Sequence, residues 1–200
     1  MTFYYHNLGK LSFITKVVFL GLLIVGFSLY FLPLTDRPSL AVQILVHILF
    51  AMLLAFITTG LIYLNGYVYH FLQARLFKSE ILSGLFSKYG FVDDLINTNT
   101  KWKLTQQVKT GLIDTYPVVV LRSHEKAGHI LVVIEIEASE TAINEIMQLE
   151  TLFKCMNAQV GPGAIVGSFN IHERIEDSIK QLIKTAKQNG LKAATSKGYV

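Results

Sequence analysis

The pattern of hydrophobic and polar positions divides the chain into two parts. Two long charge-free runs, residues 17–34 and 41–64, lie before Arg75, whereas the rest of the chain mixes charged with alternating apolar positions. As helices, these runs extend about 27 Å and about 36 Å, enough to cross the hydrocarbon core of a bilayer. Pro33 and Pro38 in the short connection end one helix and begin the next. The pattern predicts a transmembrane helical hairpin over residues 1–78, with spans at about 12–34 and 41–67.

The charges that flank the hairpin predict its orientation. Lys10 and Lys16 precede it and Arg75 and Lys78 follow it, while the connection holds a single Arg beside a single Asp. Because cytoplasmic loops carry the excess of Lys and Arg, both termini are expected in the cytosol of a multi-pass inner-membrane protein. A cleaved signal peptide is the alternative for the first run, but its exit lacks the small residues that a signal peptidase requires.

Four residues of the second span recur at intervals of four and share one helix face, namely His47, Ala51, Ala55 and Thr59. Small side chains let helices approach closely in lipid, so we interpret this row as the face through which the spans oligomerise. An imidazole is costly in lipid, which directs His47 toward a neighbouring helix or a wet cavity. A helix–helix hydrogen bond and a pore-lining or proton-handling role both remain open for it.

Residues 79–200 predict a cytosolic α+β domain with an antiparallel sheet of three to four strands and helices mainly on one face. Helices are expected over 81–89, 140–156 and 170–189, the first with Ser79 as its cap and Gly90 at its end. Strands are expected over 101–109, 116–122 and 129–137, with a short strand near 161–167.

Alternation within these strands predicts which side chains are buried. In the strand over 101–109 it places Trp102 on the buried face and lysines on the opposite face. Residues 130–134 are all apolar, so this strand is expected to be covered on both faces, the second face by another copy or a partner.

Charge is unevenly distributed along the chain. The net charge is +4 and the isoelectric point is about 9.1. Residues 1–78 carry five Lys or Arg and one Asp, whereas residues 79–200 carry thirteen basic and thirteen acidic residues. Cations beside a membrane that face anionic lipid explain the basic isoelectric point, which therefore does not indicate nucleic-acid binding.

Three motifs resemble enzyme signatures without meeting their requirements. His124 and His129 are five residues apart across a turn, whereas a zinc-protease motif needs two histidines four apart on a helix. The glycines of 161–167 lack a Walker lysine and the dinucleotide-binding spacing. Cys155 has no clear histidine and carboxylate partners, which predicts a buried structural thiol. We expect no catalytic residue, no metal and no cofactor.

Two basic features are candidates for binding. The first is predicted to receive an anionic ligand such as a nucleotide and combines a strand face with the neighbouring hairpin tip: Lys101, Lys103, Lys109, Arg122, His124, Lys126 and His129. The second lies on the last helix, beside the core-facing positions Ile175, Ile179, Leu182, Ile183 and Ala186, and contains Lys180, Lys184 and Lys187. These last lysines suit an anionic membrane surface or another anion, with a solvated helix face as the alternative.

The layout of two spans followed by a cytosolic domain resembles that of small prokaryotic effectors of nucleotide-triggered antiviral defence, although no motif is shared. The resemblance implies a homo-oligomer that acts as a ligand-controlled pore or disrupts the membrane. Membrane-anchored adaptors, immunity proteins and secretion-machine subunits, which bind another protein, share the same layout. We therefore expect a non-enzymatic membrane protein whose cytosolic domain binds a ligand or a protein partner.

Overall fold

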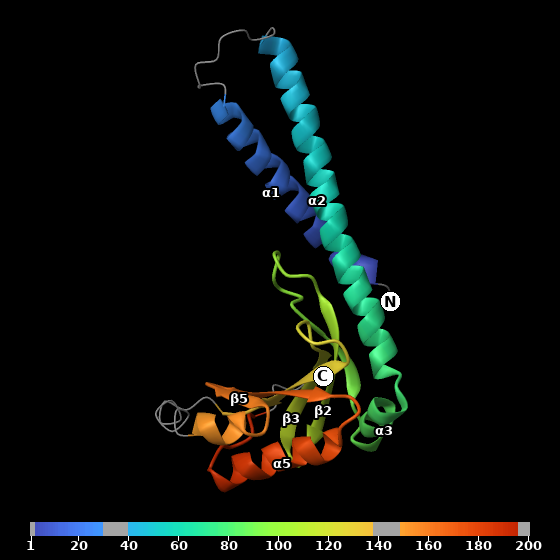
Figure 1. Cartoon of the computed structure of the whole chain (residues 1–200), viewed down its shortest axis with the longest axis vertical. Coiled ribbons are helices and arrows are strands. Elements are labelled where there is room, and N and C mark those ends of the chain that lie inside the picture. Colours follow the sequence, from blue (N-terminus) through green and yellow to red (C-terminus); the bar gives the residue numbers. More distant parts are fainter. Residues whose placement is uncertain (1–2, 30–39, 138–148, 196–200) are drawn as a thin grey trace. The chain divides into compact units, whose positions relative to one another are not determined.

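The computed structural model describes residues 3–29, 40–137 and 149–195 (Figure 1). The chain forms two compact units. The first contains Met1–Phe71 and Ile96–Gln106, and the second contains Leu72–Leu95 and Gln107–Val200. The connections between them are the long second helix and two neighbouring strands.

The first unit contains the two long apolar helices that the sequence predicts. Helix α1 spans Phe3–Leu29 and helix α2 spans Leu40–Phe77. Both are long and apolar enough to cross a membrane, and only 11% of the most apolar stretch of each is buried. Helix α1 extends past its predicted span toward the N-terminus, and α2 continues past its predicted span to Phe77.

The loop of residues 97–105, which belongs to the same unit, packs against the first turns of α1. The side-chain amide of Asn7 is buried; it donates to the carbonyl of Thr105 (3.2 Å) and accepts from the N–H of Thr105 (2.7 Å). The ammonium of Lys10 donates to the carbonyls of Lys103 (3.0 Å) and Asn97. Leu104 fills the space that a Cβ atom on Gly66 of α2 would occupy. Side chains of the helices thus satisfy backbone groups of this loop.

The second unit is built on a six-stranded antiparallel sheet in the order β1-β2-β3-β4-β6-β5, more strands than the three to four predicted. The strands are β1 (Val92–Ile96), β2 (Gln106–Ile113), β3 (Tyr116–Arg122), β4 (His129–Glu135), β5 (Ala158–Gly161) and β6 (Ala164–Asn170). The β5–β6 hairpin corresponds to the short strand and tight loop expected near 161–167.

One predicted strand begins at the wrong residue, and one strand was not predicted. The strand expected over 101–109 begins only at Gln106, because the preceding backbone bonds to α1 and not to a neighbouring strand. Trp102 is consequently 65% exposed and not in the core. Strand β1 was not predicted, since its sequence VDDLI carries two aspartates, which an edge strand tolerates.

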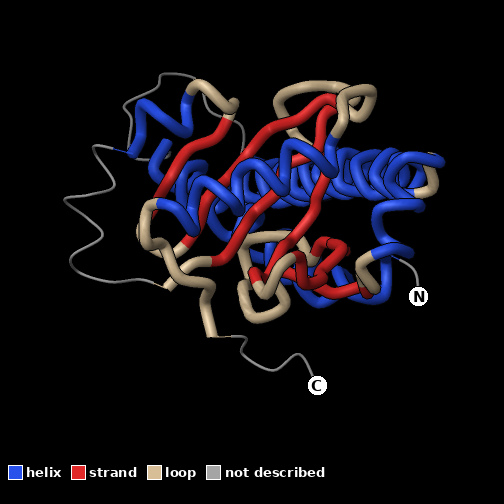
Figure 2. The backbone as a smooth tube through the Cα atoms, turned by 90° about the horizontal axis from the view of Figure 1, so that it is seen from below, coloured by secondary structure: helices blue, strands red, loops and turns tan. Residues whose placement is uncertain are grey.

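Helices cover one face of the sheet and form the core there. They are α3 (Glu80–Lys88), residues 149–154 and α5 (Ile175–Gln188), and Figure 2 shows α5 lying over the strands. The five core-facing residues predicted on α5 are all buried, which confirms its amphipathic pattern. The helix predicted over 140–156 falls partly on residues 138–148, outside the described part of the chain.

The structure shows how far β4 and Cys155 are buried. Ile130, Val132 and Ile134 are completely buried, while Leu131 and Val133 on the opposite face are only half-buried. Within the chain, the core-forming helices cover β4 on one face only, and coverage of its second face by another copy or a partner stays a prediction. Cys155 follows the end of the helix at Lys154 and is exposed, so the predicted burial of its thiol is wrong.

Glu176 ties α5 to α3. Its carboxylate accepts hydrogen bonds from the ammonium groups of Lys180 (2.8 Å) and Lys88 (2.7 Å) and from the hydroxyl of Tyr89 (2.8 Å). These three donors, Lys180 first, lower the pKa of Glu176 from 4.5 to about 2 because they stabilise its charged form.

We expect Glu176→Gln to destabilise the folded protein at neutral pH but not near pH 2. A lowered pKa contributes stability above the unfolded-state value of 4.5, and this contribution disappears as the pH falls toward about 2. Denaturant unfolding of the full chain in detergent at several pH values measures the difference between wild type and variant. Asp177→Asn, at the exposed neighbouring position, is the control. A difference that is constant from pH 7 to pH 2 would contradict the assignment.

Candidate functional site

A pocket of about 580 Å³ opens in the second unit beside the β3–β4 turn. Its floor comes from the less covered face of the sheet, where Leu131 of β4 pairs with Ser168 of β6. His129 precedes Leu131 by two residues on β4, so both side chains lie on the same face of the sheet. Val166 of β6 lies on this face as well. Lys154, Asn157 and Gln159 form the opposite wall, where the chain enters β5.

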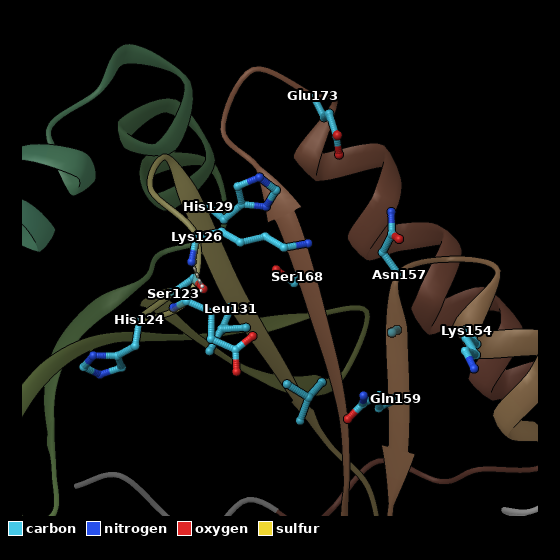
Figure 3. A pocket seen from close by; sticks show the side chains of 13 residues that line it. Ser123, His124, Lys126, His129, Leu131, Lys154, Asn157, Gln159, Ser168 and Glu173 are labelled. Atoms are coloured by element: carbon cyan, nitrogen blue, oxygen red, sulfur yellow. Dashed lines mark hydrogen bonds between the residues drawn. The ribbon is translucent and has the colours of Figure 1, made fainter.

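The β3–β4 turn is a preformed wall of this pocket. The hydroxyl of Ser123 accepts from the N–H groups of Glu125 and Lys126, both at 3.3 Å. Gly128 has a φ of 73°, a conformation in which glycine avoids the strain of a side chain. These constraints hold Lys126 at the pocket, and Figure 3 shows its side chain reaching from the turn toward Ser168.

The pocket carries charges of both signs. Lys126 and Lys154 are cationic, and Glu125 and Glu173 are anionic. The Nδ1 atom of His129 is buried and has no hydrogen-bond partner among the described residues. A buried polar atom of this kind is normally paired.

The two histidines of the turn have different orientations. Figure 3 shows the imidazole of His129 beside Lys126, whereas His124 points away from both. Burial, and secondarily the charge of Arg122, lower the pKa of His124 and favour its neutral form. Within residues 3–29, 40–137 and 149–195, no three His, Cys, Asp or Glu side chains converge as metal ligands.

The structure brings together three of the seven residues predicted to bind an anion, namely His124, Lys126 and His129. Arg122 lies at the end of β3, outside the pocket lining, and its N–H donates to the Gln73 side chain (3.2 Å). The role of all seven residues as a ligand site stays a prediction.

The other three predicted residues lie elsewhere. Lys109 forms an ion pair with Asp93 (3.0 Å) and lies over the ring of Phe86. Lys101 and Lys103 lie in the 97–105 loop of the first unit. The sequence analysis missed Lys154, Ser168 and Glu173, whose proximity to the turn depends on the pairing of β4 with β6 and carries no local sequence signal.

The row of small residues on α2 packs against α1 of the same chain. Ala51 and Ala55 are buried, and the hydroxyl of Thr59 accepts from that of Thr15 (3.0 Å). His47 Nε2 lies 3.2 Å from the carbonyl oxygen of Leu22. The row thus forms contacts inside one hairpin, including the helix–helix hydrogen bond considered for His47; its role in a pore or oligomer stays a prediction.

A glycine on α1 makes room for the His47 ring. A Cβ atom on Gly26 would lie 1.5 Å from His47 Nε2, which is far inside van der Waals contact. The ring also meets Phe27 edge-on, with centroids 6.2 Å apart. Close approach of the two helices therefore depends on the absence of a side chain at this position.

Two of the three lysines predicted on α5 pair within the domain. Lys180 bonds Glu176, and Lys187 lies 3.8 Å from Asp114 and over the ring of Tyr116. Lys184 is exposed. Contact of this row with a membrane surface or an anion stays a prediction.

Comparison of the chain with protein-family models, with curated proteins and with solved structures gives no match. The geometry of the two units is therefore the basis for the functional proposal.

We expect Gly26→Ala to destabilise the hairpin by about 1–3 kcal/mol, the usual cost of overpacking a well-packed site. Gly21→Ala is the matched control, because a Cβ there meets nothing within 4 Å. Thermal unfolding in detergent measures both variants. Adding His47→Ala to Gly26→Ala removes the obstructing ring and is expected to recover part of the loss. Equal stability of Gly26→Ala and Gly21→Ala would contradict this account of the contact.

Proposed function

We propose that this chain is a membrane-anchored binding protein. Helices α1 and α2 anchor it in the bilayer as a hairpin, and the sheet domain on the cytosolic side binds a small polar ligand in the pocket beside the β3–β4 turn.

The exposed apolar surface of the two helices carries this proposal. Large side chains point outward along both, for example Ile24 (71% exposed) and Leu61 (62% exposed). Soluble proteins rarely expose a continuous apolar surface of this length. A core helix of a soluble protein would be mostly buried, whereas these stretches are 11% buried. A signal sequence would account for α1 alone and leave α2 unexplained.

Contacts within the first unit support a shared side for the two ends of the hairpin. Asn7 near the start of α1 bonds Thr105, which follows α2 in the chain. Both therefore lie on one side of the membrane if α1 and α2 each cross it once. Because Lys10, Lys16, Arg75 and Lys78 also lie at this end of the helices, the positive-inside rule favours the cytosol.

The pocket supports a binding role for the sheet domain. The constrained turn forms one of its walls, its floor includes Leu131 and Val166, and most of the remaining lining is polar or charged. A concave site on which several polar groups converge is a candidate for binding a small polar molecule. A protein partner as the ligand, assembly of the spans into an oligomer or pore, and the absence of enzymatic activity stay predictions.

The exposed thiol of Cys155 provides a test of topology, since it is the only cysteine in the chain. A membrane-impermeant maleimide is expected to label inside-out membrane vesicles but not intact spheroplasts, and the protein should remain in the membrane after carbonate extraction. The variant Cys155→Ser/Ser39→Cys, with its thiol in the helix connection, should label from the opposite side. Release by carbonate, or labelling of Cys155 in intact spheroplasts, would overturn the anchor or its orientation.

Pocket binding can be tested with a panel of linear and cyclic adenosine and guanosine nucleotides, scored by thermal stabilisation of the full chain in detergent. For a nucleotide that stabilises the wild type, Lys126→Gln and Lys154→Gln are each expected to weaken binding about tenfold, the effect of losing one charge-assisted hydrogen bond. Lys192→Gln, at an exposed position after α5, is the control. If no nucleotide stabilises the protein, the nucleotide class is wrong; unchanged affinity in both pocket variants would place the site elsewhere.

A further inference from the structure

We infer that the 97–105 loop is an interfacial membrane anchor, in which Trp102 inserts among lipid headgroups while Lys101 and Lys103 contact anionic lipid phosphates. The inference rests on the proposed insertion of α1 and α2 into a bilayer. It concerns the loop alone and is independent of any ligand in the pocket.

Trp102 is exposed yet held in place. Its ring meets Phe13 of α1 edge-on, with centroids 5.0 Å apart, and 65% of the residue remains accessible. The ammonium of Lys101 lies over the ring of the same Phe13, 5.6 Å from its centroid. Contacts from Asn7 and Lys10 to the loop backbone fix the loop on the same helix. Because the loop already holds the indole of Trp102 in place, the side chain loses little conformational entropy when it inserts among lipid headgroups.

The position of Phe13 along α1 sets the depth of the indole. The charge-free run begins at Val17, four residues later, which is about 6 Å along the helix axis. The headgroup region on each side of the hydrocarbon core is about 5–8 Å thick. If the run from Val17 occupies the hydrocarbon core, Trp102 lies at the level of the headgroups, where tryptophan is enriched.

The neighbouring charges favour anionic lipid as the contact. Lys101 and Lys103 are both exposed on either side of Trp102. Lysine stems pack along apolar surface while the ammonium reaches the phosphates, and the cytoplasmic leaflet is anionic. A protein partner would also bury an exposed indole, but continuity of the loop with the apolar surface of α1 favours lipid. In this role the two lysines contact lipid phosphates and take no part in the pocket beside the β3–β4 turn.

The experiment uses Trp102 as its own probe, because it is the only tryptophan in the chain. The full-length protein is reconstituted into phosphatidylcholine vesicles with or without phosphatidylglycerol. Fluorescence quenching by acrylamide and by lipids brominated near the headgroup or near the bilayer centre is then measured. We expect strong quenching by the shallow bromines, weak quenching by the deep ones, and protection from acrylamide that increases with phosphatidylglycerol.

The variant Lys101→Gln/Lys103→Gln is expected to lose the dependence on phosphatidylglycerol. Arg174→Gln/Lys192→Gln, which removes the same charge from exposed positions of the sheet domain outside the predicted membrane-facing row of α5, should retain it. An unchanged dependence in the loop variant would overturn the role of the two lysines.

Three further results would overturn the anchor while leaving the proposed function intact, provided that the protein co-floats with the vesicles. They are free quenching by acrylamide, quenching mainly by deep bromines, and protection from acrylamide without quenching by any brominated lipid, which would indicate burial against protein. Failure of the protein to co-float would instead overturn both the membrane anchor and this inference.

Discussion

The backbone of the 97–105 loop requires hydrogen-bond partners, and it finds several of them on α1. A buried backbone group without a partner costs about 1–3 kcal/mol, so the amide of Asn7, which serves both the N–H and the carbonyl of Thr105, is a strong constraint. It removes this stretch from the sheet and makes it part of the helical unit. The start of β2 at Gln106 and the exposure of Trp102 both follow from this contact.

The same constraint explains where sequence reasoning succeeds and where it fails. Long apolar runs and the helical period of α5 are local signals, and they predict the two apolar helices and the buried face of α5 correctly. The alternation over 101–109 is also a local signal. It does not show that a residue almost a hundred positions earlier, Asn7, competes for the backbone of the segment. The proximity of Lys154 to Lys126 likewise depends on long-range pairing of strands.

The sequence of α2 does not identify the helix that packs against its row of small residues. A row with a period of four indicates close helix packing but does not identify the neighbour. Here the neighbour of Ala51, Ala55 and Thr59 is α1, and the ring of His47 occupies the space beside Gly26 where a side chain would lie. Since these side chains are occupied within one hairpin, assembly of several copies through the same row would require α1 to leave it. Contacts between copies are accommodated more readily by the outward faces of the helices.

The position of the pocket follows from the one-sided packing of the sheet. Helices cover the face that carries Ile130, Val132 and Ile134, which leaves the opposite face partly open. Along that face the residues change from apolar Val133 to polar His129 and Ser168 as β4 and β6 approach the β3–β4 turn. An open face that becomes polar where a rigid turn forms a wall satisfies two needs of a binding site, concavity and directed hydrogen bonds. The charges of both signs around it favour a ligand that accepts and donates hydrogen bonds over one recognised by net charge alone.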